Sequence, residues 1–206
     1  MLLRTLLRVT VVFAIAVVAS CNDDEFESGE KSSAQTSASA SSSSVAGAGG
    51  GSACADLGDV CTSCELAACA DRYCACYENT ACGLLASCVL ACPLSDTSCL
   101  QACYAQHPDG ISDGALLVHC AASDCPQACP GYQPLEPCTL CLYEECPATM
   151  NTCVANAECT QLLLCVDACS DETCENQCYA DYPAGLGDAA ALGTCSQRHC
   201  IEACGG

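Results

Sequence analysis

The sequence predicts an all-α protein made of two tandem, disulfide-stapled small helical repeats that follow a disordered tether. Three observations lead to this expectation. The cysteine spacing of one half of the chain recurs in the other half. Many cysteines lie three or four residues apart, the spacing that places side chains on one face of a helix. The chain has 27 cysteines but only two phenylalanines and no tryptophan, so disulfides must supply stability that an aromatic core would otherwise give.

The first 20 residues have the composition of an export signal. Two arginines precede an apolar stretch over residues 9–19, which is shorter than the ~20 residues of a membrane-spanning helix. Residues 18–21, Val-Ala-Ser-Cys, resemble the lipobox of bacterial lipoproteins. This resemblance implies removal of residues 1–20, lipid attachment at Cys21 and a place in the cell envelope, at the outer membrane or cell surface. The alternative is a secreted protein without lipid, in which Cys21 joins a disulfide.

Residues 21–53 predict a flexible tether between the lipid and the folded part. Most of residues 28–53 are Ser, Ala, Gly or Thr without apolar periodicity, a composition typical of flexible linkers. The whole chain has 25 acidic and five basic residues, a formal net charge of −20. This charge excludes a nucleic acid as partner and predicts a solvated, mutually repelling surface.

The cysteines from residue 61 onward form two matching series, which define a first repeat over residues 54–131 and a second over residues 132–206. Ten of the eleven intervals agree; six residues separate Cys92 from Cys99, but four separate Cys169 from Cys174. The first series is Cys61, Cys64, Cys69, Cys76, Cys82, Cys88, Cys92, Cys99, Cys103, Cys120, Cys125 and Cys129. The second is Cys138, Cys141, Cys146, Cys153, Cys159, Cys165, Cys169, Cys174, Cys178, Cys195, Cys200 and Cys204.

Capping and turn residues predict the helices within each repeat. Asn79 and Asn156 suit the N-caps of helices over residues 80–92 and 157–169. Ser95 or Asp96 in the first repeat, and Ser170 in the second, suit the start of the next helix. The turns expected to end these helices contain Pro108 and Gly110, and Pro183 and Gly185. A further helix is expected over about residues 115–129, and residues 130–137 predict a short, semi-rigid spacer.

The repeats resemble the tandem cysteine-rich repeats of exported myxobacterial lipoproteins. The resemblance rests on the Cys-x2-Cys-x4-Cys openings, the Cys-x3-Cys helices and the turns CYAQHPDG and CYADYPAG. The chain departs from that pattern at Cys69, which stands alone, and at the additional Cys74. The resemblance therefore implies no disulfide pairing, and it implies no known activity.

Two kinds of disulfide are predicted from position. The helices that carry Cys88, Cys92, Cys99 and Cys103 follow one another closely and must run antiparallel, which predicts an inner pair Cys92–Cys99 and an outer pair Cys88–Cys103. The corresponding pairs of the second repeat are Cys169–Cys174 and Cys165–Cys178. Cys54 and Cys74 are outside the matched series, and both are absent from the second repeat, so we expect them to bond to each other.

Two chemical functions remain as alternatives to a structural one. CTSC at residues 61–64 and CTLC at residues 138–141 have the spacing of a thiol-disulfide oxidoreductase site, or of zinc ligands in a thiolate cluster. Twelve cysteines per repeat and the lack of a thioredoxin-like strand pattern argue against the oxidoreductase site. The oxidising exported context and the lack of cationic residues to offset thiolates argue against the metal cluster. The histidines His107, His119 and His199 do not recur between the repeats and are interpreted as surface residues.

The sequence thus predicts a lipid-anchored, disulfide-rich envelope protein that acts as a structural or interaction module. No catalytic constellation, cofactor motif or metal site is identified. Its expected partners are the membrane, through acylated Cys21, and an unknown protein or surface ligand.

Overall fold

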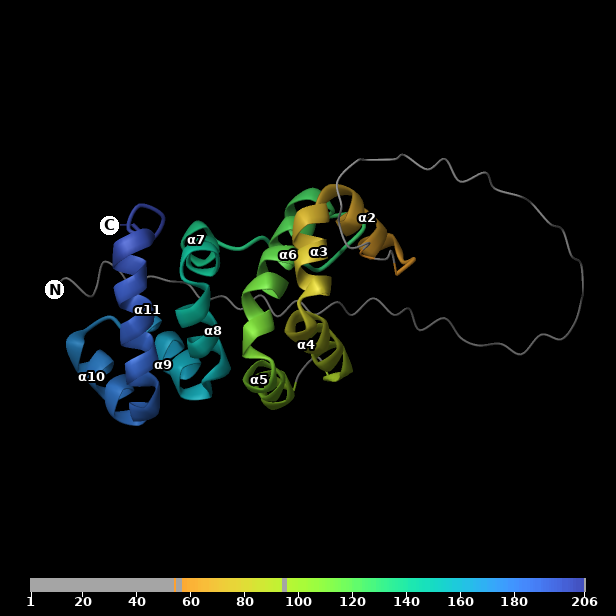
Figure 1. The fold of residues 1–206 in the computed structure, drawn as a ribbon. Coiled ribbons are helices and arrows are strands. Elements are labelled where there is room, and N and C mark those ends of the chain that lie inside the picture. The colour runs from red at the N-terminus through yellow and green to blue at the C-terminus, as the bar shows by residue number, and fades with distance from the viewer. Residues whose placement is uncertain (1–53, 55–56, 94–95, 206) are drawn as a thin grey trace, which may run out of the picture.

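The structure is a computed structural model that describes residue 54, residues 57–93 and residues 96–205 (Figure 1). Over these residues the chain forms ten α-helices and two 3₁₀ turns and contains no β-strand. The predicted all-α fold is therefore confirmed. The expected signal peptide, Cys21 and the whole of the expected tether lie outside the described residues.

Both repeats contain the same elements in the same order. The first contains α2 (Val60–Ala68), α3 (Ala70–Glu78), α4 (Thr80–Ala91), α5 (Thr97–Gln106), η1 (Pro108–Gly110) and α6 (Ile111–Asp124). The second contains α7 (Pro137–Glu145), α8 (Pro147–Ala155), α9 (Ala157–Asp167), α10 (Glu172–Asp181), η2 (Pro183–Gly185) and α11 (Leu186–His199). Helices of this length are marginal in water by themselves, so they depend on packing and cross-links.

Asn79 and Asn156 connect the middle helix of each repeat to the turn before the last helix. Each carboxamide oxygen caps its own helix by accepting a backbone N–H two residues ahead, at 3.0 Å. Each carboxamide nitrogen donates to an aspartate, Asp113 or Asp188, at 2.7 Å and also to a carbonyl of the 3₁₀ turn. Both predicted N-caps are confirmed, and each also joins two parts of its repeat.

The Pro-x-Gly turns bring the chain directly against the start of the middle helix. A Cβ on Gly110 would lie 2.5 Å from backbone atoms of Ala81 and Cys82. A Cβ on Gly185 would lie 2.5 Å from backbone atoms of Glu158. Because backbone atoms cannot move aside, only glycine fits at these two positions. This close approach explains why the glycine recurs at the same place in both repeats.

Aspartates begin the helix after each middle helix. Asp96 caps α5 by accepting the backbone N–H of Cys99 at 3.0 Å, which agrees with one of the two predicted starts. In the second repeat the prediction of Ser170 is wrong by one residue, because Asp171 caps α10 and accepts the N–H of Cys174 at 2.9 Å. A carboxylate is favoured at a helix N-terminus, since its negative charge interacts with the positive end of the helix dipole.

The last helix of the first repeat begins earlier than predicted. Instead of residues 115–129, α6 covers Ile111–Asp124, because the backbone of Gly110 is already helical and the 3₁₀ turn continues directly into the α-helix. The helix ends at Asp124, because the next residue, Cys125, precedes Pro126 and has left the helical region of backbone space. A 14-residue helix results, long enough to contact most of the repeat.

The two repeats lie side by side and share one apolar core (Figure 1). Leu85, Leu100 and Ile111 of the first repeat belong to the same buried cluster as Leu142 and Met150 of the second. None of these five side chains is more than 6% exposed. The repeats are thus joined by α5 and α6 packing against α7 and α8.

The segment between the repeats is docked rather than extended as a spacer. The backbone N–H of Leu135 donates to His119 Nδ1 on α6 at 2.9 Å, and the Leu135 side chain packs against the shared core. Pro137, expected as the end of the spacer, is the first residue of α7, where its missing N–H is not needed. Residues 130–137 therefore help to hold the repeats together.

Candidate functional site

Thirteen disulfides join all 26 cysteines from Cys54 to Cys204. In the matched series of each repeat, the first three cysteines bond to the last three in reverse order, and the other six bond locally. The thirteenth bond, Cys54–Cys74, belongs to the first repeat but lies outside the matched series. The first repeat contains Cys61–Cys129, Cys64–Cys125, Cys69–Cys120, Cys76–Cys82, Cys88–Cys103 and Cys92–Cys99. The second contains Cys138–Cys204, Cys141–Cys200, Cys146–Cys195, Cys153–Cys159, Cys165–Cys178 and Cys169–Cys174. We call this nested pattern the disulfide framework.

All five disulfides expected from the sequence are present in the structure. They are Cys54–Cys74, Cys88–Cys103, Cys92–Cys99, Cys165–Cys178 and Cys169–Cys174. The four hairpin bonds join the α4 and α5 region and the α9 and α10 region, and their nested pairing agrees with the expected antiparallel helices. The loop that differs in length between the repeats lies at the tip of this hairpin and leaves the pairing unchanged.

The long-range bonds tie the first helix of each repeat to its end. Cys61–Cys129 and Cys64–Cys125 close loops of 68 and 61 residues around α2 and α6. In the chain-entropy account, closing one loop of this size contributes about 4 kcal/mol, and nested bonds contribute less than the sum of their separate values. Many of these sulfurs are also buried, so the framework fills part of the core as well as constraining the unfolded chain.

The two Cys-x-x-Cys motifs do not form internal disulfides. Cys61 and Cys64 bond to Cys129 and Cys125, and the motif of the second repeat has the equivalent partners. A thiol-disulfide oxidoreductase site needs the two cysteines of one motif to bond to each other during its cycle. The pairing in the structure therefore removes the geometric basis of the redox alternative.

Four groups of sulfur and carboxylate atoms in the described part of the chain are close enough to surround an ion. They are Cys92, Cys99 and Cys103; Cys169, Cys174 and Cys178; Cys61, Glu65 and Cys129; and Cys69, Cys120 and Asp124. Every cysteine in them belongs to a disulfide, so its sulfur carries no thiolate charge. Structural zinc sites are built from thiolates, and these groups do not supply them.

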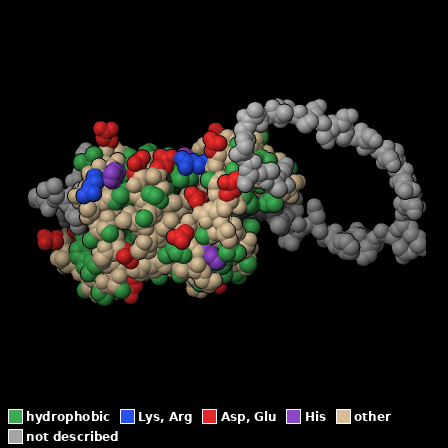
Figure 2. Space-filling model, viewed as in Figure 1, with side chains coloured by type: hydrophobic (Ala, Val, Ile, Leu, Met, Phe, Trp, Pro, Cys, Tyr) green, Lys and Arg blue, Asp and Glu red, His purple; other side chains and the backbone are tan. Residues whose placement is uncertain are grey.

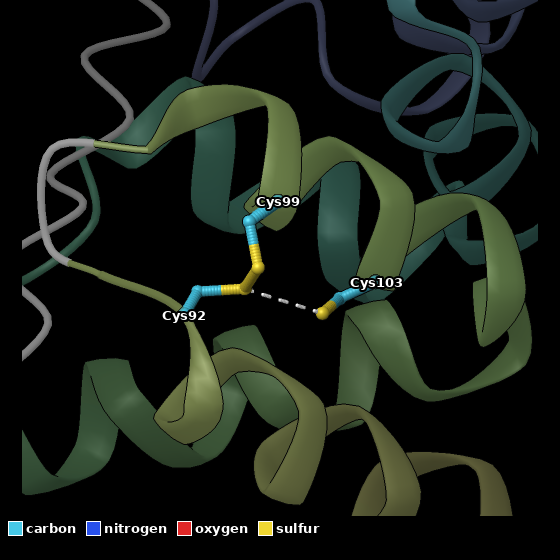
Figure 3. Close-up of side chains that lie close together, drawn as sticks. All are labelled: Cys92, Cys99 and Cys103. Atoms are coloured by element: carbon cyan, nitrogen blue, oxygen red, sulfur yellow. Dashed lines mark hydrogen bonds between the residues drawn. A yellow bond between two sulfur atoms is a disulfide. The ribbon is translucent and has the colours of Figure 1, made fainter.

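Sulfur atoms of neighbouring disulfides touch in both hairpins. Cys92 Sγ lies 3.6 Å from Cys103 Sγ, although Cys92 is bonded to Cys99 and Cys103 to Cys88 (Figure 3). In the second repeat Cys169 Sγ lies 3.5 Å from Cys178 Sγ. Each hairpin thus contains two disulfides in van der Waals contact.

Glu65 is a buried carboxyl group that sequence reasoning missed. Its side chain on α2 is only 4% exposed, and its Oε1 atom lies 3.7 Å from the sulfur of Cys61, which is bonded to Cys129 and carries no proton to donate. Burial, and then the negative charge of Asp59, raise the pKa of Glu65 to about 7. The aligned residue of the second repeat is Leu142. This alignment could have revealed Glu65 from the sequence, because it places a carboxyl group at a core position.

Polar contacts accompany the shared core between the repeats. Arg72 forms an ion pair with Glu144 at 2.9 Å, and Ser112 donates its hydroxyl to Asn151 at 2.5 Å. Burial raises the pKa of the Tyr143 phenol, which keeps it protonated. Arg72, Ser112, Tyr143 and Glu144 are among the residues around a shallow groove of about 470 Å³. The groove is a seam of the interface, where Arg72 is paired with Glu144 and the acidic residues Asp113 and Glu145 also line it.

The three histidines occupy unrelated positions, as their lack of recurrence predicts. His119 is partly buried and accepts the N–H of Leu135, so it has a structural role rather than a purely surface one. His107 is partly buried at the end of α5, and His199 is exposed at the end of α11. Acidic side chains are spread over the visible face of both repeats, where basic ones are few (Figure 2).

Cys21, the predicted lipid attachment site, lies outside the described residues. In the described part of the chain, no single helix is long and apolar enough to cross a membrane; α3 and α4 meet that test only together, with a bend of 92° between them. No protein-family model matches the chain, and neither a curated protein nor a solved structure matches it.

Proposed function

We propose that this protein is an exported lipoprotein whose two repeats serve as a structural or interaction module at the surface of the cell envelope. Cys21 carries the lipid, residues 21–53 act as the tether, and the repeats contact a protein or another surface ligand. The proposed role is not catalytic. The proposal also places the repeats with the cysteine-rich repeats of exported myxobacterial lipoproteins that they resemble.

The complete pairing of the 26 cysteines is the observation that supports this proposal most. Disulfides in such number persist in an oxidising compartment, because cytosolic reductants would keep the thiols reduced. The disulfide-rich helical fold is therefore that of a protein exposed to the exterior or to the envelope. A fully cross-linked fold suits a module that must keep its shape outside the cell.

The acidic surface supports a position away from the lipid itself. The chain has a net charge of −20, and the described part contains only Arg72 and Arg198 as basic residues. An anionic bilayer repels such a surface within about 10 Å at moderate salt. A tether that projects the repeats outward from the membrane fits this charge.

Lipid attachment is tested by producing the full chain in a bacterium that processes lipoproteins. We expect a mature protein that begins at Cys21, carries acyl mass and partitions into the detergent phase on phase separation. The variant Cys21→Ser should remain in the aqueous phase with its thirteen disulfides intact. A soluble wild-type product that begins elsewhere, or a Cys21 bonded to another cysteine, would overturn the lipid anchor.

Surface exposure is tested separately with protease on intact cells. Residues 22–53 contain no cysteine, so a cut there releases the repeats from the anchor, whereas a cut within the repeats leaves the fragments joined by disulfides. We expect release of an intact disulfide-bonded unit from whole cells. Release that requires prior opening of the outer membrane would place the module inside that membrane instead.

A further inference from the structure

The contact between neighbouring disulfides recurs in both hairpins although the hairpin loops differ. The inner bonds Cys92–Cys99 and Cys169–Cys174 span seven and five residues. The distance from the inner to the outer disulfide is nevertheless 3.6 Å in one repeat and 3.5 Å in the other. The contact is therefore a property of the hairpin and not an accident of one loop.

We propose that each hairpin is a thiol-disulfide exchange site, where attack by an external thiol on the inner bond is passed to the outer bond. The external partner is a small monothiol. In the first repeat the product keeps one cross-link between the two helices, Cys92–Cys103, and carries the adduct on Cys99. The hairpin thus accepts a thiol without coming apart.

The exchange balances without any additional oxidant or reductant. The external thiolate bonds to Cys99 Sγ, breaks the Cys92–Cys99 bond and leaves a thiolate on Cys92. That thiolate bonds to Cys103 Sγ and breaks the Cys88–Cys103 bond, which leaves a thiolate on Cys88 that takes a proton from water. Cys92, Cys99 and Cys103 each change their disulfide partner, and Cys88 becomes a free thiol. The number of disulfide bonds stays the same. In the second repeat Cys169, Cys174, Cys178 and Cys165 take the corresponding parts.

The attack of Cys92 on Cys103 needs only a small movement of side chains. Cys92 Sγ must approach Cys103 Sγ by ~1.5 Å to reach bonding distance, a movement within reach of a side-chain rotation. Figure 3 shows Cys92 and Cys99 bonded on one side of the hairpin, with Cys103 directly across from Cys92. No backbone separation is required, because the outer disulfide is already in contact.

Burial gives the exchange a direction in the first repeat. Cys92 is 8% exposed and Cys103 only 1%, whereas Cys99 and Cys88 are both partly exposed. Within the inner bond, an external thiol therefore reaches Cys99 before Cys92. The exchange then moves the thiolate from the buried Cys92 to the more solvated Cys88, which stabilises the charge. In the second repeat Cys169 and Cys165 are both partly buried, so the same step has less preference for one side.

The negative charge around Cys99 determines which external thiols can approach. Asp96 lies at the helix start beside Cys99, and hydrogen bonds from Ser98 and Cys99 lower the pKa of its carboxyl group, which stays ionised. With a chain charge of −20, an anionic thiol is repelled from the site. A neutral monothiol is the probe of choice, and we use 2-mercaptoethanol.

The first test treats the native, full-length protein with 2-mercaptoethanol, quenches with acid, labels thiols with N-ethylmaleimide and maps the peptides. We expect the adduct on Cys99, a Cys92–Cys103 bond and the label mainly on Cys88. In the second repeat the label should divide between Cys165 and Cys169. Label on Cys92 with Cys88–Cys103 intact would overturn the proposal, and so would opening of other disulfides while both inner bonds stay closed.

A second test needs no external thiol. Cys99→Ser leaves Cys92 unpaired beside the outer bond, and at pH 8 the label should appear on both Cys92 and Cys88. Cys174→Ser provides the same test in the other repeat if the first variant does not fold. The matched control is Cys82→Ser, because its partner Cys76 belongs to none of the close sulfur groups found in the described residues. Label confined to Cys92 and to Cys169 in the two variants would contradict the exchange.

Discussion

The two repeats have the same disulfide framework but differ at their outward faces. The face of the first repeat that meets the second contains Leu100, Ile111 and Leu116, which are 2%, 3% and 6% exposed. The aligned residues at the outward face of the second repeat are Glu175, Leu186 and Ala191. Of these, Leu186 is 39% exposed and Ala191 is exposed. Large apolar side chains are therefore found where the neighbouring repeat covers them. The aligned positions that face water have a charged, a smaller or a partly exposed side chain.

The outward face of the first repeat is altered differently. In the second repeat Asn151 contacts the neighbouring repeat through Ser112. The aligned residue of the first repeat is Cys74, whose contact is the disulfide to Cys54, and both cysteines pack with the buried Tyr73. Cys54, held by this disulfide, thus covers a position at which the second repeat meets its neighbour. Repeat proteins need such modified outer faces, because an uncovered repeat interface is apolar.

The largest expected effect comes from exchanging residues between the two faces. Leu100→Glu places the charge of Glu175 in the shared core, where burying a carboxylate without a partner costs about 4 kcal/mol of the free energy of unfolding. The disulfides keep each repeat together, so calorimetry should show two separate transitions in place of one. The reverse change, Glu175→Leu, should alter stability by less than about 0.5 kcal/mol. Equal effects of the two variants would show that the faces are not different.

The disulfide at the first repeat's outward face has the next largest effect. Cys54→Ser opens a loop of 20 residues and should lower the free energy of unfolding by about 3 kcal/mol. Thiol labelling should find Cys74 alone, with every bond of the second repeat retained. The double variant Cys54→Ser/Cys74→Ser is the control, since it loses the cross-link without creating a thiol. Label on any cysteine of the second repeat would contradict the separate frameworks.

Glu65 provides a comparison that depends on pH. The pKa of Glu65 is about 7 in the folded protein and has the ordinary value of 4.5 in the unfolded chain. Between these values the folded state binds more protons, so the free energy of unfolding should fall as the pH rises and remain lower above pH 7.

Glu65→Leu copies Leu142 and should remove this pH dependence, with a gain of about 2 kcal/mol at pH 8. Glu65→Gln, which has a similar shape but no charge, should remove the pH dependence as well. Urea unfolding at pH 5 and pH 8 measures both variants. A wild-type protein equally stable at the two values would show that Glu65 titrates normally.

The smallest expected effect concerns the ion pair between the repeats. Arg72 and Glu144 are 45% and 40% exposed, and Arg72 has Thr149 as its counterpart in the second repeat. Solvent screens such a pair, so Arg72→Thr should cost less than about 1 kcal/mol. The effect should shrink further in 1 M salt. A larger, salt-independent loss would mean that the Arg72 side chain contributes packing instead.

Local features were predictable and long-range ones were not. Asn79 and Asn156 cap helices through contacts two residues away, and the hairpin bonds follow from two short helices in sequence. Cys61–Cys129 spans 68 residues, and the spacing of twelve cysteines permits many other pairings. The docking of Leu135 and the burial of Glu65 depend on which helices meet, and this is set only when the shared core forms.

Each repeat folds around the same nested disulfide framework. Peptide mapping of the unreduced, denatured protein tests it most directly. We predict no free thiol between Cys54 and Cys204, with Cys61–Cys129 and Cys64–Cys125 in the first repeat and the equivalent bonds in the second. A Cys61–Cys64 bond, or different pairings at matching positions of the two repeats, would contradict it.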